Sequence, residues 1–400
     1  MSTTGAARPR LEHVDALRGF ALFGILVVNI GVFAFPFYGG GVPDPVYSRP
    51  LDVTVRWLIA WLFETKFYLL FSFLFGYSFT LQMAAAEHAS AAFAPRFLRR
   101  LSGLAALGVA HAILFYQGDI LVTYALLGLA LLLCRRMAPD RALRRALWLI
   151  ALASAIWVIL GALSFLDSVS AGYGAQYKAD ALASIEAYRG TIGTTIAQHI
   201  KELTETIWFT VLLVQGPFVF AMFLAGYALG RRHALADPWR SRRALGLLCA
   251  LGVLPGLAGA AAYATSALPQ ASVAWELPGL AVGLFTAPLL ALSYGAAFLL
   301  ALRTGPGRRL GAWLAPAGRM ALSNYLMQSV VCAFLFTAWG LRLYAAVPPL
   351  AAFLIAVVIF AAQLPLSAWW LRRHAYGPVE WFLRALTIGA WPPWRCARAP

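Results

Sequence analysis

The sequence predicts an all-α polytopic membrane protein with about ten transmembrane helices and with both termini in the cytoplasm. Three observations predict this fold class. Of the 400 residues, 61% are hydrophobic and only 12% are charged, whereas soluble domains are about half apolar and about a quarter charged. Apolar runs of about 20 residues, long enough to cross the hydrocarbon core as helices, recur along the chain. The arginines also gather in alternate loops, as in proteins that obey the positive-inside rule.

Ten spans are expected from the apolar runs, which lack the alternation of a membrane β-barrel. They cover residues 16–36, 60–85, 99–116, 119–134, 145–166, 205–229, 244–264, 278–301, 316–338 and 348–371. With the N-terminus inside, arginine clusters fall in the cytoplasmic loops, and the outer loops carry few basic residues. The net charge of +16 therefore reports topology. We expect membrane lipids as partners and no nucleic acid.

The first span carries three hydrogen-bonding groups. Asp15 and Arg18 share a helix face because they are three positions apart. Asp15 could simply cap the helix, and Arg18 could extend to the headgroups. Asn29 lies about 16 Å further along the axis, so it either joins helices or orients a carbonyl or a water in a cavity. No cleavage site of small residues follows this stretch, which favours a retained helix.

The next three spans bring further ionisable groups. Glu64 and Lys66, at the outer end of the second span, are either interfacial charges or the mouth of a polar cavity. His111 is the one histidine inside a predicted span, and a tight outer turn follows it, ending at Asp119. A neutral imidazole can take a proton from an attacking hydroxyl or amine, and a carboxylate can hold its tautomer. His111 and Asp119 are thus a candidate base and orienter. The alternatives are a histidine satisfied by a backbone carbonyl and a helix cap.

The middle of the chain is a polar outer loop followed by glycine-rich spans. The loop, residues 167–204, shows helical periodicity over 178–189 and either caps a site on the outer face or is a solvated connector. Two stretches resemble each other: FLFGYSF and RRLSGLAALGV of spans 2–3, and FLAGYAL and RRALGLLCALGV of spans 6–7. This similarity predicts a parallel internal repeat, in which the glycines allow close helix packing.

The last two spans end the transmembrane bundle, residues 1–371. Arg319, Ser323, Asn324 and Gln328 recur at about helical spacing near the start of span 9, so this polar stripe should face the bundle interior. Arg319 could bind a phosphate group as a bidentate donor or anchor the helix at the interface. In the cytoplasmic tail, residues 372–400, YGPVEWFLRALTIG predicts an amphipathic helix on the membrane surface. The whole chain, 1–400, is predicted to form a single integral-membrane domain.

Several sequence motifs are absent. We find no dinucleotide fingerprint, phosphate-binding loop, zinc-protease motif or nucleophile elbow. The four cysteines lie in predicted spans or on the cytoplasmic side, so we expect neither a disulfide framework nor a metal site. The absence of these motifs leaves three candidate functions, which are acyl transfer in the membrane, transport and a structural role.

Five segments resemble, in order, those of the YeiB-type bacterial inner-membrane proteins of unknown function: LEHVDALRGFALFGILVVNIGVF, KFYLLFSFLFGYSF, RRLSGLAALGVAHAILFYQGDIL, GRMALSNYLMQS and YGPVEWFLRALTIG. That family is similar to heparan-α-glucosaminide N-acetyltransferase and to other transmembrane acyltransferases. The resemblance implies transfer of an acyl group from cytoplasmic acyl-CoA to a hydroxyl or amine on the far side of the bacterial cytoplasmic membrane. It places Asn29 on an asparagine that works beside the catalytic histidine of the heparan enzyme. The stretch after Asn29 has no histidine, so either His111 supplies the base from another helix or the chemistry differs.

The leading hypothesis is therefore an acyltransferase that uses acyl-CoA as donor and a small or lipid-linked acceptor. The predicted site has three parts: catalytic residues His111, Asp119 and Asn29; donor-binding residues Arg18, Arg319, Asn324 and Gln328; and cavity residues Asp15, Glu64 and Lys66. The alternatives are a transporter or exporter and a non-catalytic binding or sensory protein. Self-association into a homodimer is left open.

Overall fold

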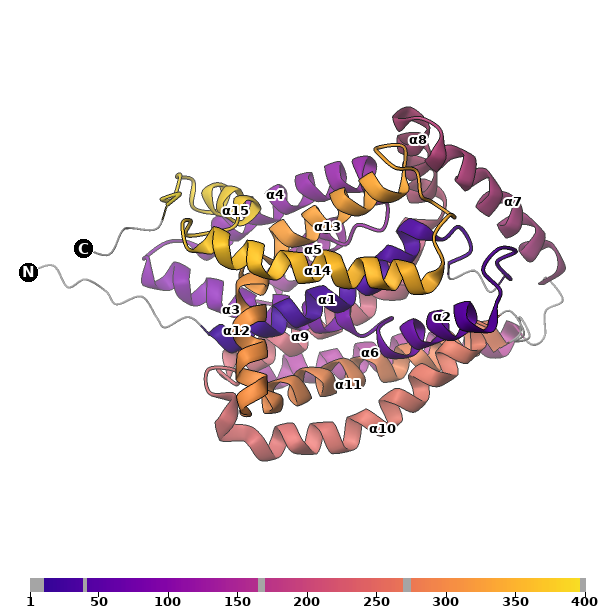
Figure 1. The fold of residues 1–400 in the computed structure, drawn as a ribbon. Coiled ribbons are helices and arrows are strands. Elements are labelled where there is room, and N and C mark those ends of the chain that lie inside the picture. The colour runs from indigo at the N-terminus through magenta and orange to yellow at the C-terminus, as the bar shows by residue number, and fades with distance from the viewer. Residues whose placement is uncertain (1–10, 39–41, 165–169, 269–274, 396–400) are drawn as a thin grey trace, which may run out of the picture.

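The computed structural model describes residues 11–38, 42–164, 170–268 and 275–395, and within these ranges the chain is helical and forms no β-strand. The α-helices are α1 (Glu12–Ala34), α2 (Pro50–Leu62), α3 (Phe67–His88), α4 (Phe93–Leu114), α5 (Leu121–Leu133), α6 (Pro139–Ser164), α7 (Ser170–Arg189), α8 (Ile192–Glu202), α9 (Gly216–Arg231), α10 (Arg242–Ser266), α11 (Glu276–Ala301), α12 (Gly305–Arg319), α13 (Ala321–Phe336), α14 (Pro349–Leu371) and α15 (Pro378–Ile388). Short π-helices, η1 (Leu203–Ile207) and η2 (Thr210–Gln215), precede α9, and a 3-10 turn, η3 (Pro238–Ser241), precedes α10. Most of the long helices run side by side, with α15 at one end of the bundle and α7 and α8 at the other (Figure 1).

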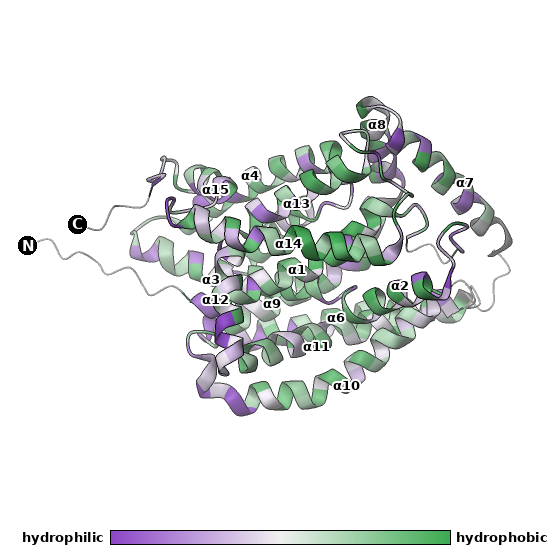
Figure 2. Cartoon of the chain, in the orientation of Figure 1, coloured by the Kyte–Doolittle hydropathy of each residue, from purple (hydrophilic) through white to green (hydrophobic). Residues whose placement is uncertain are grey.

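The predicted fold class is confirmed. Within the described ranges, eight helical segments are long and apolar enough to cross a membrane, and α5 and α13 are shorter apolar helices. Together these segments correspond to the ten predicted spans. Hydrophobic residues fill the middle of the bundle, and hydrophilic residues gather towards its ends and along α12 (Figure 2). Cys134, Cys249 and Cys332 are free thiols, and Cys396 lies outside the described residues.

Two predicted spans are divided in the structure. The second span breaks between Leu62 and Phe67, where Thr65 has a φ of 66°. The buried Lys66 ammonium donates to the Ala60 carbonyl (2.8 Å), so it caps the C-terminal end of α2, where a positive charge is favourable. The ninth predicted span is split at Met320, because α12 is a separate helix that the sequence did not predict.

Helix α12 crosses α1 at a steep angle (Figure 1), and two glycines permit the contact. A Cβ atom at Gly318 would lie 2.5 Å from the Gly19 amide nitrogen, and one at Gly19 would lie 2.4 Å from the Leu314 carbonyl oxygen. Larger residues here would separate the two backbones. This crossing positions Arg319, at the end of α12, beside the beginning of α1.

Helices α3 and α9, which carry the two FLxGY segments, pack directly against each other. A Cβ atom at Gly76 would lie 2.1 Å from the Phe223 carbonyl oxygen, and one at Gly226 would lie 2.0 Å from the Phe73 carbonyl oxygen. The contact is reciprocal, because Phe73 corresponds to Phe223 and Gly76 to Gly226 in the repeat. Such reciprocity is what a two-fold relation between equivalent helices produces.

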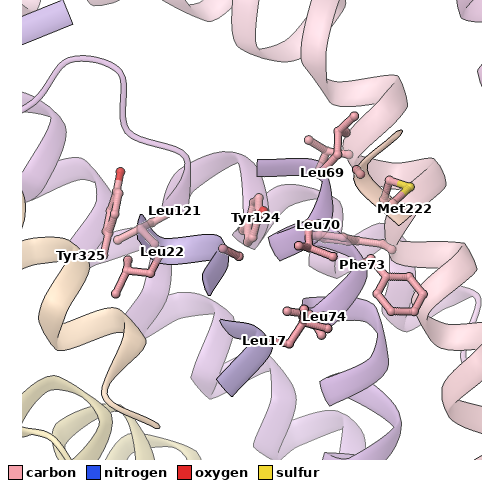
Figure 3. Packing of buried hydrophobic residues seen from close by; sticks show 14 of the residues in the cluster. Leu17, Leu22, Leu69, Leu70, Phe73, Leu74, Leu121, Tyr124, Met222 and Tyr325 are labelled. Carbon is pink, nitrogen blue, oxygen red and sulfur yellow. The ribbon is translucent and has the colours of Figure 1, made fainter. Parts of the chain in front are cut away.

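The core surrounds α1, which packs against α3, α12, α13 and α14. Leu17 of α1 lies close to Leu74 of α3, and Leu22 of α1 lies close to Leu121 of α5 (Figure 3). The outer loop forms α7 and α8, so its helix is longer than the sequence indicated; residues 167–169 of the predicted loop lie outside the described residues. The predicted amphipathic tail helix is α15, which packs on α4.

Candidate functional site

A cavity of about 1120 Å³ lies within the bundle. Its lining includes residues of α1, α3, α4, α5, α10, α11, α12, α13 and α15, together with the break between α2 and α3 and the π-helical η2. Arg18 and Asn29 of α1 both line it, although they are eleven residues, and thus about 16 Å, apart along the helix. The cavity therefore extends from the end of the bundle that contains α15 into the opposite half.

Arginines dominate the end of the cavity near α15, which we call the arginine mouth. This group consists of Arg18, Arg96, Arg100, Arg319 and Arg384, which come from α1, α4, α12 and α15. The cavity between the arginine mouth and Asn29 is mainly apolar, with Leu22, Ile25 and Leu74 in its wall. A charged group is thus favoured at one end and an apolar group further in.

The carboxylate of Glu380 also lines the arginine mouth, but it serves another purpose. One carboxylate oxygen accepts from the backbone N–H groups of Leu322 (2.8 Å) and Ser323 (3.0 Å), and the other accepts from the Ser323 hydroxyl (2.5 Å). Glu380 of α15 thereby caps the N-terminus of α13. Burial raises the pKa of Glu380, while the hydrogen bonds from Ser323 and Leu322 oppose the rise. Glu380 and the Asp15 carboxylate that pairs with Arg18 cannot neutralise five guanidinium groups, so the mouth keeps excess positive charge.

The arginines of the mouth differ in their partners. Arg18 donates to the Asp15 carboxylate (2.6 Å) and to the Ser78 hydroxyl (2.6 Å), and Arg319 donates to the Ala375 carbonyl (2.9 Å). In the described part of the chain we find no hydrogen bond or ion pair to Arg100, whose Nε atom is buried without a partner. Arg100 therefore has donors that are free for a ligand.

The predicted pair of His111 and Asp119 is formed. His111 Nδ1 lies 2.8 Å from Asp119 Oδ1, and both side chains are almost fully buried. The other carboxylate oxygen accepts from the Val122 N–H (3.0 Å), so Asp119 orients the imidazole and also caps the first turn of α5. His111 Nε2 is buried without a hydrogen-bond partner within the described residues.

The histidine pair lies in the wall of the cavity and does not line it. The imidazole ring of His111 packs against the rings of Tyr325 (centroids 5.2 Å apart) and Tyr116 (6.0 Å), and both tyrosines line the cavity. One aromatic layer therefore separates Nε2 from the cavity. At the end of the bundle away from α15, α8 covers this end of α4 through His199, whose Nδ1 lies 3.0 Å from the Ile113 carbonyl oxygen. Burial lowers the pKa of His199 to about 4.

The end of the cavity remote from the arginines contains carboxylates. Glu64 lines it and accepts from the hydroxyls of Tyr38 (2.5 Å) and Tyr263 (2.7 Å). Glu276, in the first turn of α11, lines the cavity as well. Asn29 faces this space, and no hydrogen bond joins its amide to the described residues. Its amide can therefore bind a ligand without breaking a protein contact.

Several predicted residues are placed elsewhere. Asn324 donates to the Ala317 carbonyl (3.1 Å) and to the Ser367 hydroxyl (2.9 Å), and Gln328 donates to Gln363 (2.8 Å). These fully buried amides face the interior, as expected of the polar stripe, but they join α13 to α12 and α14 and do not reach the cavity.

Asp15 and Lys66 do not line the cavity either. Asp15 lies behind Arg18 and holds its guanidinium. Lys66 is the cap of α2 and is 1% exposed. Of the ten predicted site residues, the cavity wall contains Arg18, Asn29, Glu64 and Arg319.

The sequence did not single out Arg96, Arg100, Arg384, Tyr263 or Glu276 as site residues. The three arginines fit the positive-inside pattern. Their charge alone does not indicate whether a side chain faces the lipid headgroups or the interior of the bundle. A usable signal was the position of Arg100 just inside a predicted span, where an unpaired charge is costly.

Comparison with known proteins places the chain among uncharacterized relatives. The family described as "Protein of unknown function (DUF418)" matches residues 229–390. The chain is 32% identical to the uncharacterized protein YxaH of Bacillus subtilis, over 96% of each chain. It is 30% identical to the uncharacterized protein YeiB of Escherichia coli, over 95% of this chain and 97% of YeiB. It is also 30% identical to a 39.9 kDa protein of Bacillus acidopullulyticus, over 94% of each. No solved structure matches.

Proposed function

The chain belongs to the YeiB family of bacterial membrane proteins, whose function is unknown, and we propose that it is an acyltransferase of the cytoplasmic membrane. The cavity is the basis of this proposal. The protein transfers an acyl group from cytoplasmic acyl-CoA to an acceptor that reaches the outer half of the bundle. The arginine mouth carries the proposal: five guanidinium groups at one end of a cavity whose continuation is apolar.

The chemistry of acyl-CoA fits this distribution of charge. Guanidinium groups bind phosphates in bidentate geometry, and the donor has three phosphate groups at its nucleotide end. The pantetheine arm and the acyl chain then follow the apolar middle of the cavity. Such an orientation brings the thioester towards Asn29, whose amide donates a hydrogen bond to the thioester carbonyl oxygen and stabilises the oxyanion.

His111 is the base in the proposed reaction. Its Nδ1–H is held by Asp119, so Nε2 takes the proton of the acceptor hydroxyl or amine while the acceptor atom attacks the thioester carbon. The C–S bond then breaks, and the CoA thiolate takes the proton from the imidazolium. Acyl acceptor and free CoA leave, and no further reactant is needed. Because Tyr116 and Tyr325 separate Nε2 from the cavity, one of these rings must rotate before the acceptor can reach the histidine.

Ligand-dependent thermal stability tests the donor site. The purified protein is melted in detergent with acetyl-CoA, a longer acyl-CoA, free CoA or ATP. A ligand that binds only the folded protein stabilises it by about 2.7 kcal/mol at a hundredfold excess over its Kd. We expect both thioesters to raise the melting temperature more than ATP does. A folded protein that responds to no thioester would remove the basis of the proposal.

A transporter is the second candidate, and the division of the second span favours it. Transporters often bind their substrates at interrupted helices near the centre of the membrane. Here the break between α2 and α3 brings Glu64 to the cavity. If no thioester binds, uptake or export of small molecules in proteoliposomes becomes the appropriate assay.

A further inference from the structure

The end of the cavity opposite the arginine mouth has the composition of a site for a cation; we call it the carboxylate end. It consists of Glu64, Glu276, Tyr38, Tyr68 and Tyr263, all of which line the cavity. The Tyr263 hydroxyl donates to Glu64 and lies within electrostatic range of Glu276 and of Tyr68. Segments far apart in the chain therefore place two carboxylates and three aromatic rings around one space.

The carboxylate end keeps one uncompensated negative charge. Glu64 has Lys66 as a buried neighbour of opposite charge, although the Lys66 ammonium points to the Ala60 carbonyl. Glu276 is only partly buried, and among the described residues it takes part in no hydrogen bond or ion pair. A carboxylate with no cation nearby, in a cavity with low-dielectric walls, attracts a single positive charge.

A second observation at the same place points to a ligand. The Tyr68 hydroxyl is buried and has no hydrogen-bond partner in the described part of the chain, although Tyr68 lines the cavity. A buried polar group without a partner is costly, and a ligand that supplies a hydrogen bond removes this cost. The faces of the neighbouring tyrosine rings also attract cations, as in the aromatic cages that bind quaternary ammonium groups.

We infer that the carboxylate end binds the ammonium group of a ligand that also carries a hydroxyl, such as an amino alcohol or a hydroxyalkyl quaternary ammonium compound. This deepens the proposed function, on which the role of the ligand as acyl acceptor rests. An ammonium group held by carboxylates stays protonated and has no lone pair with which to attack a thioester. The hydroxyl is therefore the nucleophile, and the ammonium group is the handle that orients it.

The position of Tyr116 supports this division of roles. Its ring packs against His111, and it lies within electrostatic range of Tyr38, which donates to Glu64. An acceptor with its ammonium group at the carboxylate end thus has its other end beside the tyrosine that covers the base.

The test compares a cation with a neutral compound of the same shape. Choline, ethanolamine and 3,3-dimethylbutan-1-ol, the neutral analogue of choline, are titrated into the purified protein by calorimetry, without any CoA compound. We expect choline or ethanolamine to bind and the neutral analogue to bind at least about tenfold more weakly. Equal binding of choline and its analogue, or no binding of either ammonium compound, would overturn the inference. Since no thioester is present, that failure is distinct from a failure of the donor site.

Variants locate the site. Glu276→Gln should weaken binding of the ammonium compound about tenfold or more, while Glu276→Asp, which keeps the charge, should retain it. Glu186→Gln, at an exposed position of α7, is the matched control and should leave binding unchanged. Tyr68→Phe removes only an unpartnered hydroxyl, so it should fold normally and weaken binding several-fold. Unchanged affinity in both Glu276→Gln and Tyr68→Phe would place the cation elsewhere and refute the assignment.

Discussion

Replacing Arg100 by glutamine should weaken acyl-CoA binding without weakening the fold. The guanidinium lines the arginine mouth, and its Nε atom is buried without a partner. Burial disfavours its charge, Glu380 attracts it, and Arg18 and Arg384 repel it. Loss of this charge removes the cost of burying it, which is the largest electrostatic effect at this position, and breaks no hydrogen bond of the ligand-free protein among the described residues. We expect the melting temperature of the ligand-free variant to equal or exceed that of the wild type.

The loss of affinity follows from the hydrogen bonds that Arg100 makes to a phosphate. Hydrogen bonds that involve a charged group contribute about 1.5–3 kcal/mol, which corresponds to a Kd increase of roughly 10- to 150-fold. With a thirtyfold increase, the stabilisation at a ligand concentration of a hundred wild-type Kd falls from about 2.7 to about 0.9 kcal/mol. The melting temperature of Arg100→Gln should therefore equal or exceed that of the wild type without acyl-CoA, and it should lie below that of the wild type with acyl-CoA.

Arg99 provides the control, because it adjoins Arg100 and has the same charge. Its side chain is exposed, donates to the Thr387 carbonyl (3.0 Å from Nη2) and does not line the cavity. Thermal melting of Arg99→Gln and Arg100→Gln over a range of acetyl-CoA concentrations compares two proteins of equal net charge. Equal losses of affinity in the two variants would show that the arginines act only through overall charge and would refute the role of Arg100.

Three further predictions concern the fold. Gly226→Val should prevent folding or lower the melting temperature strongly, because its Cβ atom would lie 2.0 Å from the Phe73 carbonyl oxygen. Size-exclusion chromatography in detergent checks this prediction, and a variant that elutes like the wild type would contradict the close packing of α3 against α9. Glu380→Ala removes the cap of α13 and should lower the free energy of unfolding by about 2–4 kcal/mol. Thermal melting measures this loss, and an unchanged melting temperature would show that the fold does not need the cap. Burial lowers the pKa of His199 from its ordinary 6.5 to about 4, so the unfolded chain binds a proton between these values and the folded chain does not. Stability should therefore fall as the pH decreases through this range, by at most about 3 kcal/mol, and His199→Gln should flatten the profile of melting temperature against pH.

The number of spans and the histidine pair could be predicted from the sequence because both depend on short-range rules. The thickness of the hydrocarbon core sets the length of each apolar run. His111 and Asp119 are eight residues apart, across one tight turn, so their approach depends on little besides that turn.

The remainder of the site depends on contacts between distant segments. Glu64 bonds Tyr38 and Tyr263, which are 26 and 199 residues away in the chain. The rotation of each helix about its axis decides whether an arginine faces lipid headgroups or the cavity, and the positive-inside pattern is the same in both cases. For the same reason Asn324 could be predicted to face the interior, whereas its pairing with Ser367 of α14 could not.

Transfer of a labelled acetyl group tests the central proposal most directly. Everted membrane vesicles that contain the wild-type protein or His111→Asn are supplied with acetyl-CoA labelled in the acetyl group, so that the native membrane can provide the acceptor. Asparagine retains a donor for the Asp119 carboxylate but cannot act as a base. We predict that label accumulates in a product other than CoA only with the wild-type protein. Equal labelling by His111→Asn, or no labelling by wild-type protein that binds acetyl-CoA, would contradict the proposed acyltransferase reaction.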